Sequence, residues 1–265
     1  CPSVWAWRPG RALAMKPYVD LILCLLPFEP KELTRLDGPP GLFVGHRLAT
    51  DAAIAGAAAR QASVRVAGPP RVRRLLVLPG SRRSEVRRLI GPFADTMAQL
   101  RSRGHRLSIA MPTVPHVAAL VNEATAGWTD KPEIILDPES KWRAFGEADA
   151  ALTASGTVSL ELALCGVPFV SCYKSDPVMK ALHALITVWS ACLPNIIADR
   201  AIVPEFYNEY VRPENLARQL EALFLETPMR EWQKQGFAEV ARRMTTERPT
   251  GKLAAEAVLE LARFA

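Results

Sequence analysis

The stretch "LVLPGSRRSEV", residues 76–86, joins a strand, a turn and the start of a helix. Its first three residues are apolar, as in a buried strand, and the pattern then breaks at Pro79-Gly80-Ser81. Beyond Arg83 an apolar residue recurs every three or four positions, which predicts a helix over residues 84–103. The apolar face of that helix consists of Val86, Leu89, Ile90, Phe93, Met97 and Leu100. The stretch is thus typical of an α/β fold, and Pro92 is expected to kink or restart the helix.

The same alternation continues along the chain. Short apolar or β-branched runs predict strands at residues 107–112, 133–137, 148–155 and 168–173. Helix-length segments follow them at residues 115–126, 140–147 and 156–165, and from about residue 177. Strands that alternate with helices predict a parallel, doubly wound sheet.

The flanking segments have a different character. Residues 19–27 and 41–46 read as short strands, whereas the Ala-rich and then basic stretch 47–72 reads as a connector. From Pro213 onward the pattern is helical, with a break near residues 246–251. We therefore expect a small unit, a connector and a larger α/β domain with C-terminal helices.

The composition limits the classes of function. The chain has 265 residues and a net charge of +6, which suits an anionic ligand or an acidic membrane surface. Its arginines are scattered without interleaved aromatic residues, so nucleic-acid binding is disfavoured. The five cysteines form no CxxC pair, which argues against a disulfide framework or a zinc site and favours a reducing compartment. The apolar stretches fall short of the about 20 residues that span a membrane, and no signal peptide is recognisable.

The turn at residues 79–82 is suited to a phosphate group. Gly80 permits a tight turn and a close approach of the backbone to a ligand. The first amides of the following helix are free donors at the positive end of the helix dipole, and Arg82 adds a planar fork that matches phosphate oxygens. On the local sequence alone, a surface turn with solvated arginines explains the stretch equally well.

A second such turn lies in "TASGTVSLELALCGVP", residues 153–168. Ser155 or Thr157 can cap the helix, Gly156 allows close approach, and Glu161 follows one turn later on the face of Thr157. A carboxylate at that place could accept two ribose hydroxyls, although a plain capped helix is the simpler explanation of this turn by itself. Two such turns in one sheet, one with an arginine and one with an acid, together indicate a nucleotide diphosphate site.

Other common sites are not indicated by the sequence. It contains no GxGxxG after the first strand, no GxxxxGK[ST] and no GxSxG, and its histidines lack metal-ligand spacing. His105 and His116 read as surface residues. His46, at a predicted strand end, is the better candidate for a site, and no spacing singles out a general base among Asp20, Glu29 and Asp51.

A series of motifs then identifies a resemblance that spans the chain. In order they are "PSVWAW", "LPFE", "FVGH", "LPGSRRSEV", "ALTASGTVSLELALCGVPFV", "LPNIIADR", "VPEF" and "PENLA". The chain resembles the lipid-A-disaccharide synthases, inverting glycosyltransferases with two Rossmann-like domains in the GT-B arrangement. The resemblance implies transfer from UDP-2,3-diacylglucosamine to 2,3-diacylglucosamine 1-phosphate, giving lipid A disaccharide 1-phosphate and UDP. It also implies a cytoplasmic location, peripheral on the inner face of the inner membrane of Gram-negative bacteria.

The same resemblance implies roles for individual residues. Gly80, Ser81 and Arg82 would face the donor diphosphate, and Ser155, Gly156 and Thr157 would form the second phosphate-binding turn. Glu161 would bind the ribose, and Asn195, in "LPN", would lie near the active site and join Arg82 in catalysis. Trp5 and Trp7 would face the cleft or belong to the core. We expect no metal and no cofactor, because Arg82 and helix amides can carry the charge of the leaving group.

The resemblance also implies that part of the family's sequence is missing. The family has a further stretch before "PSVWAW" that would hold the general base, and this sequence begins at Cys1. We therefore expect a fragment, inactive by itself, with the end of an acceptor-binding domain at residues 1–55 and a linker at 56–72. The UDP-sugar-binding domain would cover residues 73–235, and helices at 236–265 would cross back to the first domain.

Two other functions remain open from the sequence. One is an enzyme similar to UDP-N-acetylglucosamine 2-epimerase, which shares the two-domain plan, and the other is a non-catalytic nucleotide-binding remnant. The apolar stretch 179–192, with Lys180 and Trp189, would be a core helix, a contact for acyl chains or membrane, or part of a homodimer contact.

Overall fold

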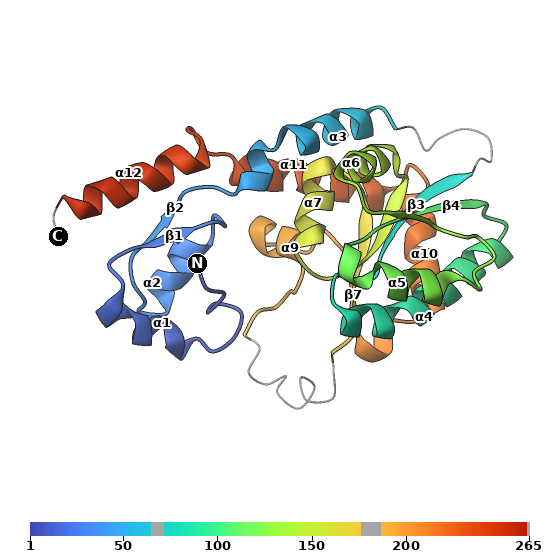
Figure 1. The fold of residues 1–265 in the computed structure, drawn as a ribbon, viewed down its shortest axis with the longest axis horizontal. Coiled ribbons are helices and arrows are strands. Elements are labelled where there is room, and N and C mark those ends of the chain that lie inside the picture. Colours follow the sequence, from blue (N-terminus) through green and yellow to red (C-terminus); the bar gives the residue numbers. More distant parts are fainter. Residues whose placement is uncertain (65–71, 176–186, 264–265) are drawn as a thin grey trace.

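The computed structural model describes residues 1–64, 72–175 and 187–263. It contains a larger α/β unit and a smaller unit at the N-terminus (Figure 1). The strands are β1 (Ile22–Cys24), β2 (Gly41–Phe43), β3 (Arg73–Leu78), β4 (Leu107–Pro112), β5 (Glu133–Ile135), β6 (Ala150–Ala154), β7 (Phe169–Tyr173) and β8 (Glu205–Tyr207). The α-helices are α1 (Gly10–Met15), α2 (Glu29–Arg35), α3 (Ala52–Ala62), α4 (Arg83–Ser102), α5 (Pro115–Thr125), α6 (Pro138–Glu147), α7 (Thr157–Cys165), α9 (Leu193–Ala198), α10 (Pro213–Leu223), α11 (Pro228–Met244) and α12 (Thr250–Ala262). Short 3-10 helices are η1 (Lys16–Tyr18), η2 (Arg47–Thr50) and η4 (Asn208–Tyr210).

The larger unit is built on a six-stranded sheet with the order β5-β4-β3-β6-β7-β8. Every pairing in it is parallel, as predicted. The chain moves outward from β3 to β4 and β5, and then returns to place β6 on the other side of β3. The strand order therefore reverses between β3 and β6, and a crevice is expected at their carboxyl ends.

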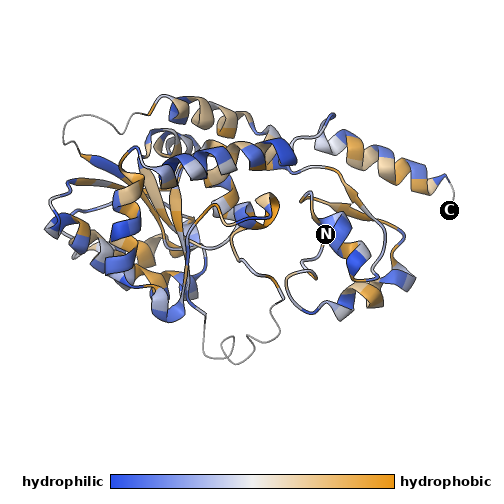
Figure 2. Cartoon of the chain, turned by 180° about the vertical axis from the view of Figure 1, so that it is seen from behind, coloured by the Kyte–Doolittle hydropathy of each residue, from blue (hydrophilic) through white to orange (hydrophobic). Residues whose placement is uncertain are grey.

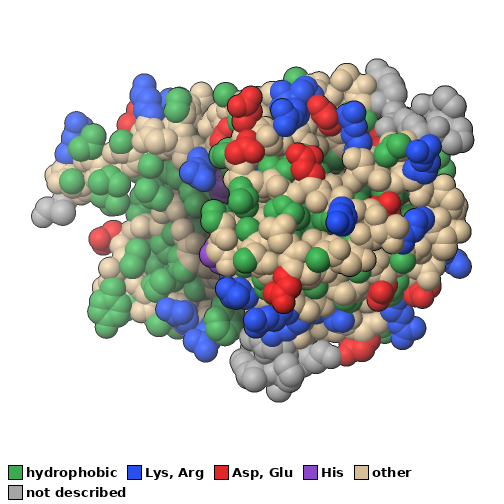
Figure 3. All heavy atoms as spheres, turned by 45° about the vertical axis from the view of Figure 1, so that its right-hand side comes forward, with side chains coloured by type: hydrophobic (Ala, Val, Ile, Leu, Met, Phe, Trp, Pro, Cys, Tyr) green, Lys and Arg blue, Asp and Glu red, His purple; other side chains and the backbone are tan. Residues whose placement is uncertain are grey.

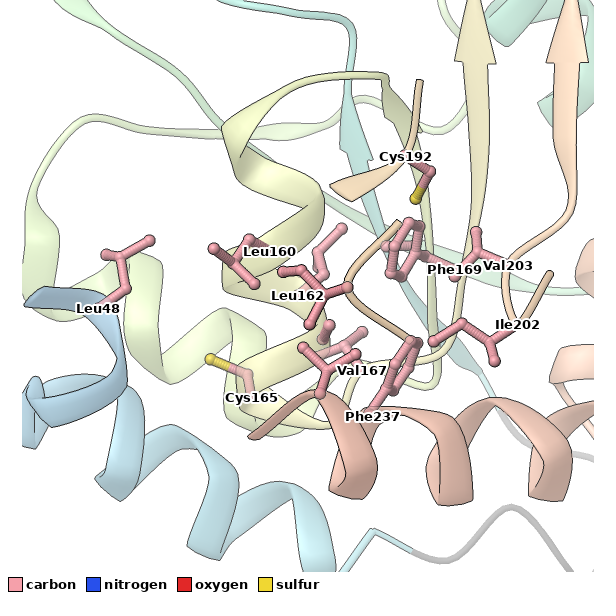
Figure 4. Packing of buried hydrophobic residues seen from close by; sticks show 14 of the residues in the cluster. Leu48, Leu160, Leu162, Cys165, Val167, Phe169, Cys192, Ile202, Val203 and Phe237 are labelled. Atoms are coloured by element: carbon pink, nitrogen blue, oxygen red, sulfur yellow. The ribbon is translucent and has the colours of Figure 1, made fainter. Parts of the chain in front are cut away.

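Alternate residues of the strands serve the two faces of this sheet. Leu75 and Val77 of β3 pack with α4, α5 and α10, whereas Leu76 and Leu78 belong to the core under α7, α9 and α11. The strands are accordingly apolar almost throughout, and Figure 2 shows them as hydrophobic ribbon between more polar helices. On the second face, Phe169 and Phe237 stack with ring centroids 5.6 Å apart and join β7 to α11 (Figure 4).

The smaller unit contains a two-stranded parallel sheet, β1-β2, with α1 and α2. Its Trp5 is buried, packs edge-on against Phe28 and donates from Nε1 to Glu29 Oε1 at 3.2 Å. Trp5 also shares the core of the larger unit, and Thr187 donates from its hydroxyl to the Trp5 carbonyl oxygen at 2.9 Å. Trp7, by contrast, is 39% exposed. Trp5 thus belongs to the core where the two units meet.

Residues 52–62, predicted to be part of a connector, form the helix α3 instead. Asp51 caps α3 by accepting from Ala53 N at 2.9 Å, and the helix packs along α6 and α7. Gln61 donates to the carbonyl oxygens of Phe145 and Ala148 at 3.0 and 2.9 Å. The alanine-rich sequence allows this close packing because its side chains are small. The first part of the proposed linker at 56–72, residues 56–62, therefore packs against the larger unit.

Other boundaries also differ from the sequence-based expectations. The proposed division between residues 235 and 236 falls inside α11, and the C-terminal helices are also interrupted at residues 224–227. Strand β8 and helices α1, α2 and α9 were not predicted. Helix α4 continues through Pro92, because its buried face extends on both sides of that residue. The helix predicted from about residue 177 lies largely outside the described residues.

The smaller unit and α12 present apolar side chains to the surface. Figure 3 shows hydrophobic side chains gathered over this end of the molecule, and the exposed residues include Leu13, Tyr18, Leu42, Val258 and Leu259. Within the described parts of the chain, none of the helices has both the length and the hydropathy to cross a membrane.

Candidate functional site

The turns that follow β3, β4, β5 and β6 surround one cavity of about 520 Å³. It lies at the carboxyl ends of these strands, where the strand order reverses. The predicted site residues that line it are Gly80, Ser81, Arg82, Ser155, Gly156, Thr157 and Glu161. The fold therefore brings the two turns singled out in the sequence to the same cavity.

The turn after β3 depends on Gly80. Its φ is +115°, and a Cβ at this position would lie 2.6 Å from Oε2 of Glu85. Glu85 accepts from Arg82 N at 3.2 Å and from Arg82 Nη1 at 2.8 Å. The Arg82 side chain is 80% exposed, so this ion pair contributes at most about 1 kcal/mol and can open readily toward a ligand.

His116 connects the next turn to this one. Its Nε2 lies 2.8 Å from the carbonyl oxygen of Ser81 and donates to it. The prediction that His116 is a surface residue is confirmed. This contact could not be predicted from the sequence, because residues 81 and 116 belong to different strand–helix units.

The turn after β6 presents the start of α7 to the cavity. Gly156 is the N-cap residue, and the space next to its Cα is open to at least 4 Å. Neither predicted capping side chain acts as a cap: the hydroxyl of Ser155 instead donates to the carbonyl oxygen of Ala191 at 2.8 Å. The backbone amides, rather than that hydroxyl, are therefore the donors that this turn offers to an anion.

Glu161 lies one turn further along α7 and forms an ion pair with Lys141 of α6, with 2.7 Å between Nζ and Oε2. Both side chains line the cavity. The cavity thus combines helix amides and the Arg82–Glu85 pair at one part of its wall with the Glu161 carboxylate at another. This arrangement can hold an anion and hydrogen-bond a neighbouring hydroxyl.

Asn195 is placed differently from the other predicted site residues. It is 1% exposed and is not among the residues that line the cavity. Its Oδ1 accepts from the amides of Ile202 and Val203 at 2.9 and 2.8 Å, and its Nδ2 donates to the Val203 carbonyl oxygen at 3.0 Å. These bonds give Asn195 a role in holding the loop before β8, and its predicted part in catalysis stays a prediction.

Glu205 of β8 extends this network toward the cavity. Its carboxylate accepts from Ser190 Oγ at 2.5 Å, Tyr207 OH at 2.6 Å, Ala191 N at 3.0 Å and Asn195 Nδ2 at 3.0 Å. Burial and then the Glu205 carboxylate raise the pKa of Tyr207, so its hydroxyl stays a donor. Because Ala191 also accepts from Ser155, the network supports the turn after β6 from behind.

We expect Glu205→Gln to lower the free energy of unfolding by about 1–2 kcal/mol, because an amide cannot accept all these hydrogen bonds. Urea unfolding of the variant measures the loss. The exposed Glu226→Gln serves as a control, with an expected change within about 0.5 kcal/mol. Equal stability of the two variants would show that the Glu205 network does not stabilise the fold.

Two of the three carboxylates considered as general bases, Glu29 and Asp51, make structural hydrogen bonds. Glu29 is 3% exposed, and it accepts from Leu25 N and Leu26 N, each at 2.9 Å, as well as from Trp5. Asp51 caps α3. Glu29 thus accepts three hydrogen bonds in a buried place, which makes it unsuitable as a general base in this arrangement.

His46 also has a defined hydrogen-bonding state. Its Nδ1 accepts from Leu48 N at 3.1 Å, so in the neutral ring Nε2 carries the proton. Burial lowers the pKa of His46, and the neighbouring Arg47 lowers it further. His46 is therefore neutral near pH 7, but the nitrogen that could take up a proton, Nδ1, is engaged with the Leu48 amide.

Potential metal ligands come together at one place in the described residues. Cys1, Cys24 and Glu29 offer ligand atoms within 4.8 Å of one another. Burial, followed by the Glu29 carboxylate, raises the pKa of the Cys24 thiol to about 11. A protonated thiol and a fully engaged carboxylate do not favour a metal.

The open parallel sheet, its cavity where the strand order reverses, and the second parallel unit define the two-domain GT-B class of glycosyltransferase folds. MurG of Acinetobacter baumannii has the same fold, with a TM-score of 0.52 and 14% identity, over 93% of this chain and 68% of that chain. MnaA of S. aureus, solved with UDP, has a TM-score of 0.55 and 12% identity, over 92% of this chain and 61% of that one.

A family model described as lipid-A-disaccharide synthetase matches residues 1–258. The lipid-A-disaccharide synthase of Rhodopseudomonas palustris is 42% identical over 267 aligned residues, which cover 100% of this chain and 67% of that protein. The chain belongs to the lipid-A-disaccharide synthase family. It spans about two thirds of the length of the curated relatives that it matches.

Proposed function

We propose that the cavity binds the UDP part of a UDP-sugar donor. The observation that carries this proposal is the meeting of both predicted turns and Glu161 in one cavity at the point where the strand order reverses. The presence of UDP in a protein of the same fold is consistent with it. The cavity offers cationic and amide donors for a diphosphate and a carboxylate for ribose hydroxyls.

The proposed arrangement assigns each part of the nucleotide to a different wall. The diphosphate would lie between the amides of Gly80 and Ser81 and those at the start of α7, with the Arg82 guanidinium closing over its oxygens. The ribose would lie beside Glu161. Val114 and Leu136 line the side formed by the turns after β4 and β5 and give a planar base an apolar surface.

For the whole protein we propose inverting transfer from UDP-2,3-diacylglucosamine to 2,3-diacylglucosamine 1-phosphate. Such a transfer needs a general base for the acceptor hydroxyl and stabilisation of the departing UDP. Arg82 and the helix amides would supply the second requirement without a metal. The family membership at 42% identity supports this reaction over that of a 2-epimerase, whose similarity is in the fold.

The acylated substrates also lead us to propose that the protein works at a membrane surface, peripheral on the inner face of the inner membrane. Apolar side chains of the smaller unit and α12 are exposed, as such a location requires. The segment 179–192, predicted as an alternative contact, lies partly outside the described residues; within its described part, Trp189 is 57% exposed.

Titration calorimetry with UDP tests the site. We expect UDP to bind and UMP to bind about tenfold more weakly, because UMP lacks one phosphate with its charged hydrogen bonds. The affinity should be unchanged by EDTA. A folded protein that binds no UDP would contradict the assignment of the site. If the protein binds UDP but transfers no sugar, even when the family's N-terminal segment is attached, it is the non-catalytic nucleotide-binding remnant.

A further inference from the structure

Lys141 is held in one position by three contacts. Its ammonium pairs with Oε2 of Glu161 at 2.7 Å. It also lies 4.3 Å from the ring centroid of Trp142 and 5.5 Å from that of Phe145, within the range of cation–π attraction. The side chain joins α6 to α7 at the wall of the cavity.

The pair is more shielded than an ordinary surface ion pair. The side chains of Lys141 and Glu161 are 27% and 17% exposed, whereas the exposed Arg82 in the same cavity is 80% exposed. Partial burial strengthens the attraction and reduces screening by salt. The ammonium therefore determines how the Glu161 carboxylate is oriented.

We propose that Lys141 is a positioning residue that sets the preference of this cavity for ribose over deoxyribose nucleotides. By binding Oε2, it leaves Oε1 of Glu161 for the ribose hydroxyls and fixes the direction in which that oxygen accepts. The inference rests on the proposed binding of UDP. It adds a residue that acts on the ligand through Glu161.

Lys141 also affects the electrostatic interaction between Glu161 and a bound diphosphate. A bound diphosphate brings negative charge into the cavity that Glu161 lines, and the diphosphate and the carboxylate repel each other. The Lys141 ammonium offsets this repulsion at a contact distance. Without it, the repulsion would turn Glu161 away from the diphosphate, and Glu161 would no longer be placed to accept from the 2′-hydroxyl.

The test compares UDP with 2′-deoxy-UDP by calorimetry on the wild-type protein and three variants. Lys141→Met removes the charge but keeps much of the apolar stem, Lys141→Arg restores a cation, and Lys131→Met removes a charge from an exposed residue that does not line the cavity. We expect the wild type and Lys131→Met to prefer UDP about tenfold, the worth of a hydrogen bond to a charged group. Lys141→Met should reduce this preference to about twofold, and Lys141→Arg should recover most of it.

The ratio of the two affinities separates the explanations. If Lys141→Met weakens both nucleotides equally and keeps the tenfold ratio, Lys141 acts through general charge and the inference is overturned. Thermal unfolding identifies a variant that fails to fold. If Lys141→Met fails to fold, Lys141→Arg tests the inference instead: a folded Lys141→Arg protein that does not prefer UDP over 2′-deoxy-UDP also overturns the inference. A wild-type protein that binds no UDP overturns the proposed function, on which this inference rests.

Discussion

Asn195→Ala is expected to lower the free energy of unfolding by about 3 kcal/mol or more. The substitution leaves the amides of Ile202 and Val203 and the carbonyl oxygen of Val203 without their partner in a buried place, at about 1–3 kcal/mol for each group. The Glu205 carboxylate loses one of its donors as well. Urea unfolding followed by circular dichroism measures the change as a shift of the midpoint.

Asn195→Asp separates the two kinds of hydrogen bond in this prediction. Its carboxylate can still accept from both amides, but it cannot donate to Val203 and it places a second negative charge beside the Glu205 carboxylate, so a loss at least as large is expected. The comparison also tests the role in catalysis that the family resemblance implies. If Asn195→Ala keeps its stability but loses glycosyl transfer in the whole protein, the structural role is wrong and a direct catalytic role is supported.

Arg82→Ala is expected to weaken UDP binding by about 1.5–3 kcal/mol, which is about 10- to 150-fold. A guanidinium can give a diphosphate two parallel charged hydrogen bonds, and alanine gives none. Stability should hardly change, because the ion pair of Arg82 with Glu85 is exposed. Calorimetry with UDP measures the affinity of the variant.

The neighbouring Arg83→Ala supplies the control. Arg83 is exposed, begins α4 and does not line the cavity, so its loss removes the same charge without a proposed contact. A small decrease in affinity through long-range attraction is expected. Equal effects of the two substitutions would mean that Arg82 contributes charge only, and an unchanged affinity in Arg82→Ala would remove it from the site.

The strand–turn–helix units from residue 73 to residue 173 were predictable because each depends on local information. Apolar runs with both faces buried mark the strands, and a recurrence of three to four residues marks α4. Gly166, with φ +76°, ends α7 as predicted. The short strand β8 was missed because three half-buried residues leave little pattern in a sequence. Helix α3 was misread because alanines indicate neither a linker nor a buried face clearly.

The cavity was predictable in part for the same reason. Gly80 and Gly156 are signals that a turn carries within itself, and a parallel sheet brings such turns to one edge. Lys141, His116 and Glu205 had no such signal. Each acts on a residue from another strand–helix unit: Lys141 on Glu161, His116 on Ser81, and Glu205 on Ala191.

The alternation of strands and helices, the two glycine turns and the family of this protein could all be read from the amino-acid sequence. These properties are encoded in runs of adjacent residues, whose spacing and composition set local conformation and motif. The three-dimensional fold was needed to see that Asn195 is buried away from the cavity, that Ser155 bonds to Ala191, and that Lys141 pairs with Glu161. Those outcomes depend on which units become neighbours in the sheet, and that is settled by packing between residues far apart in the chain.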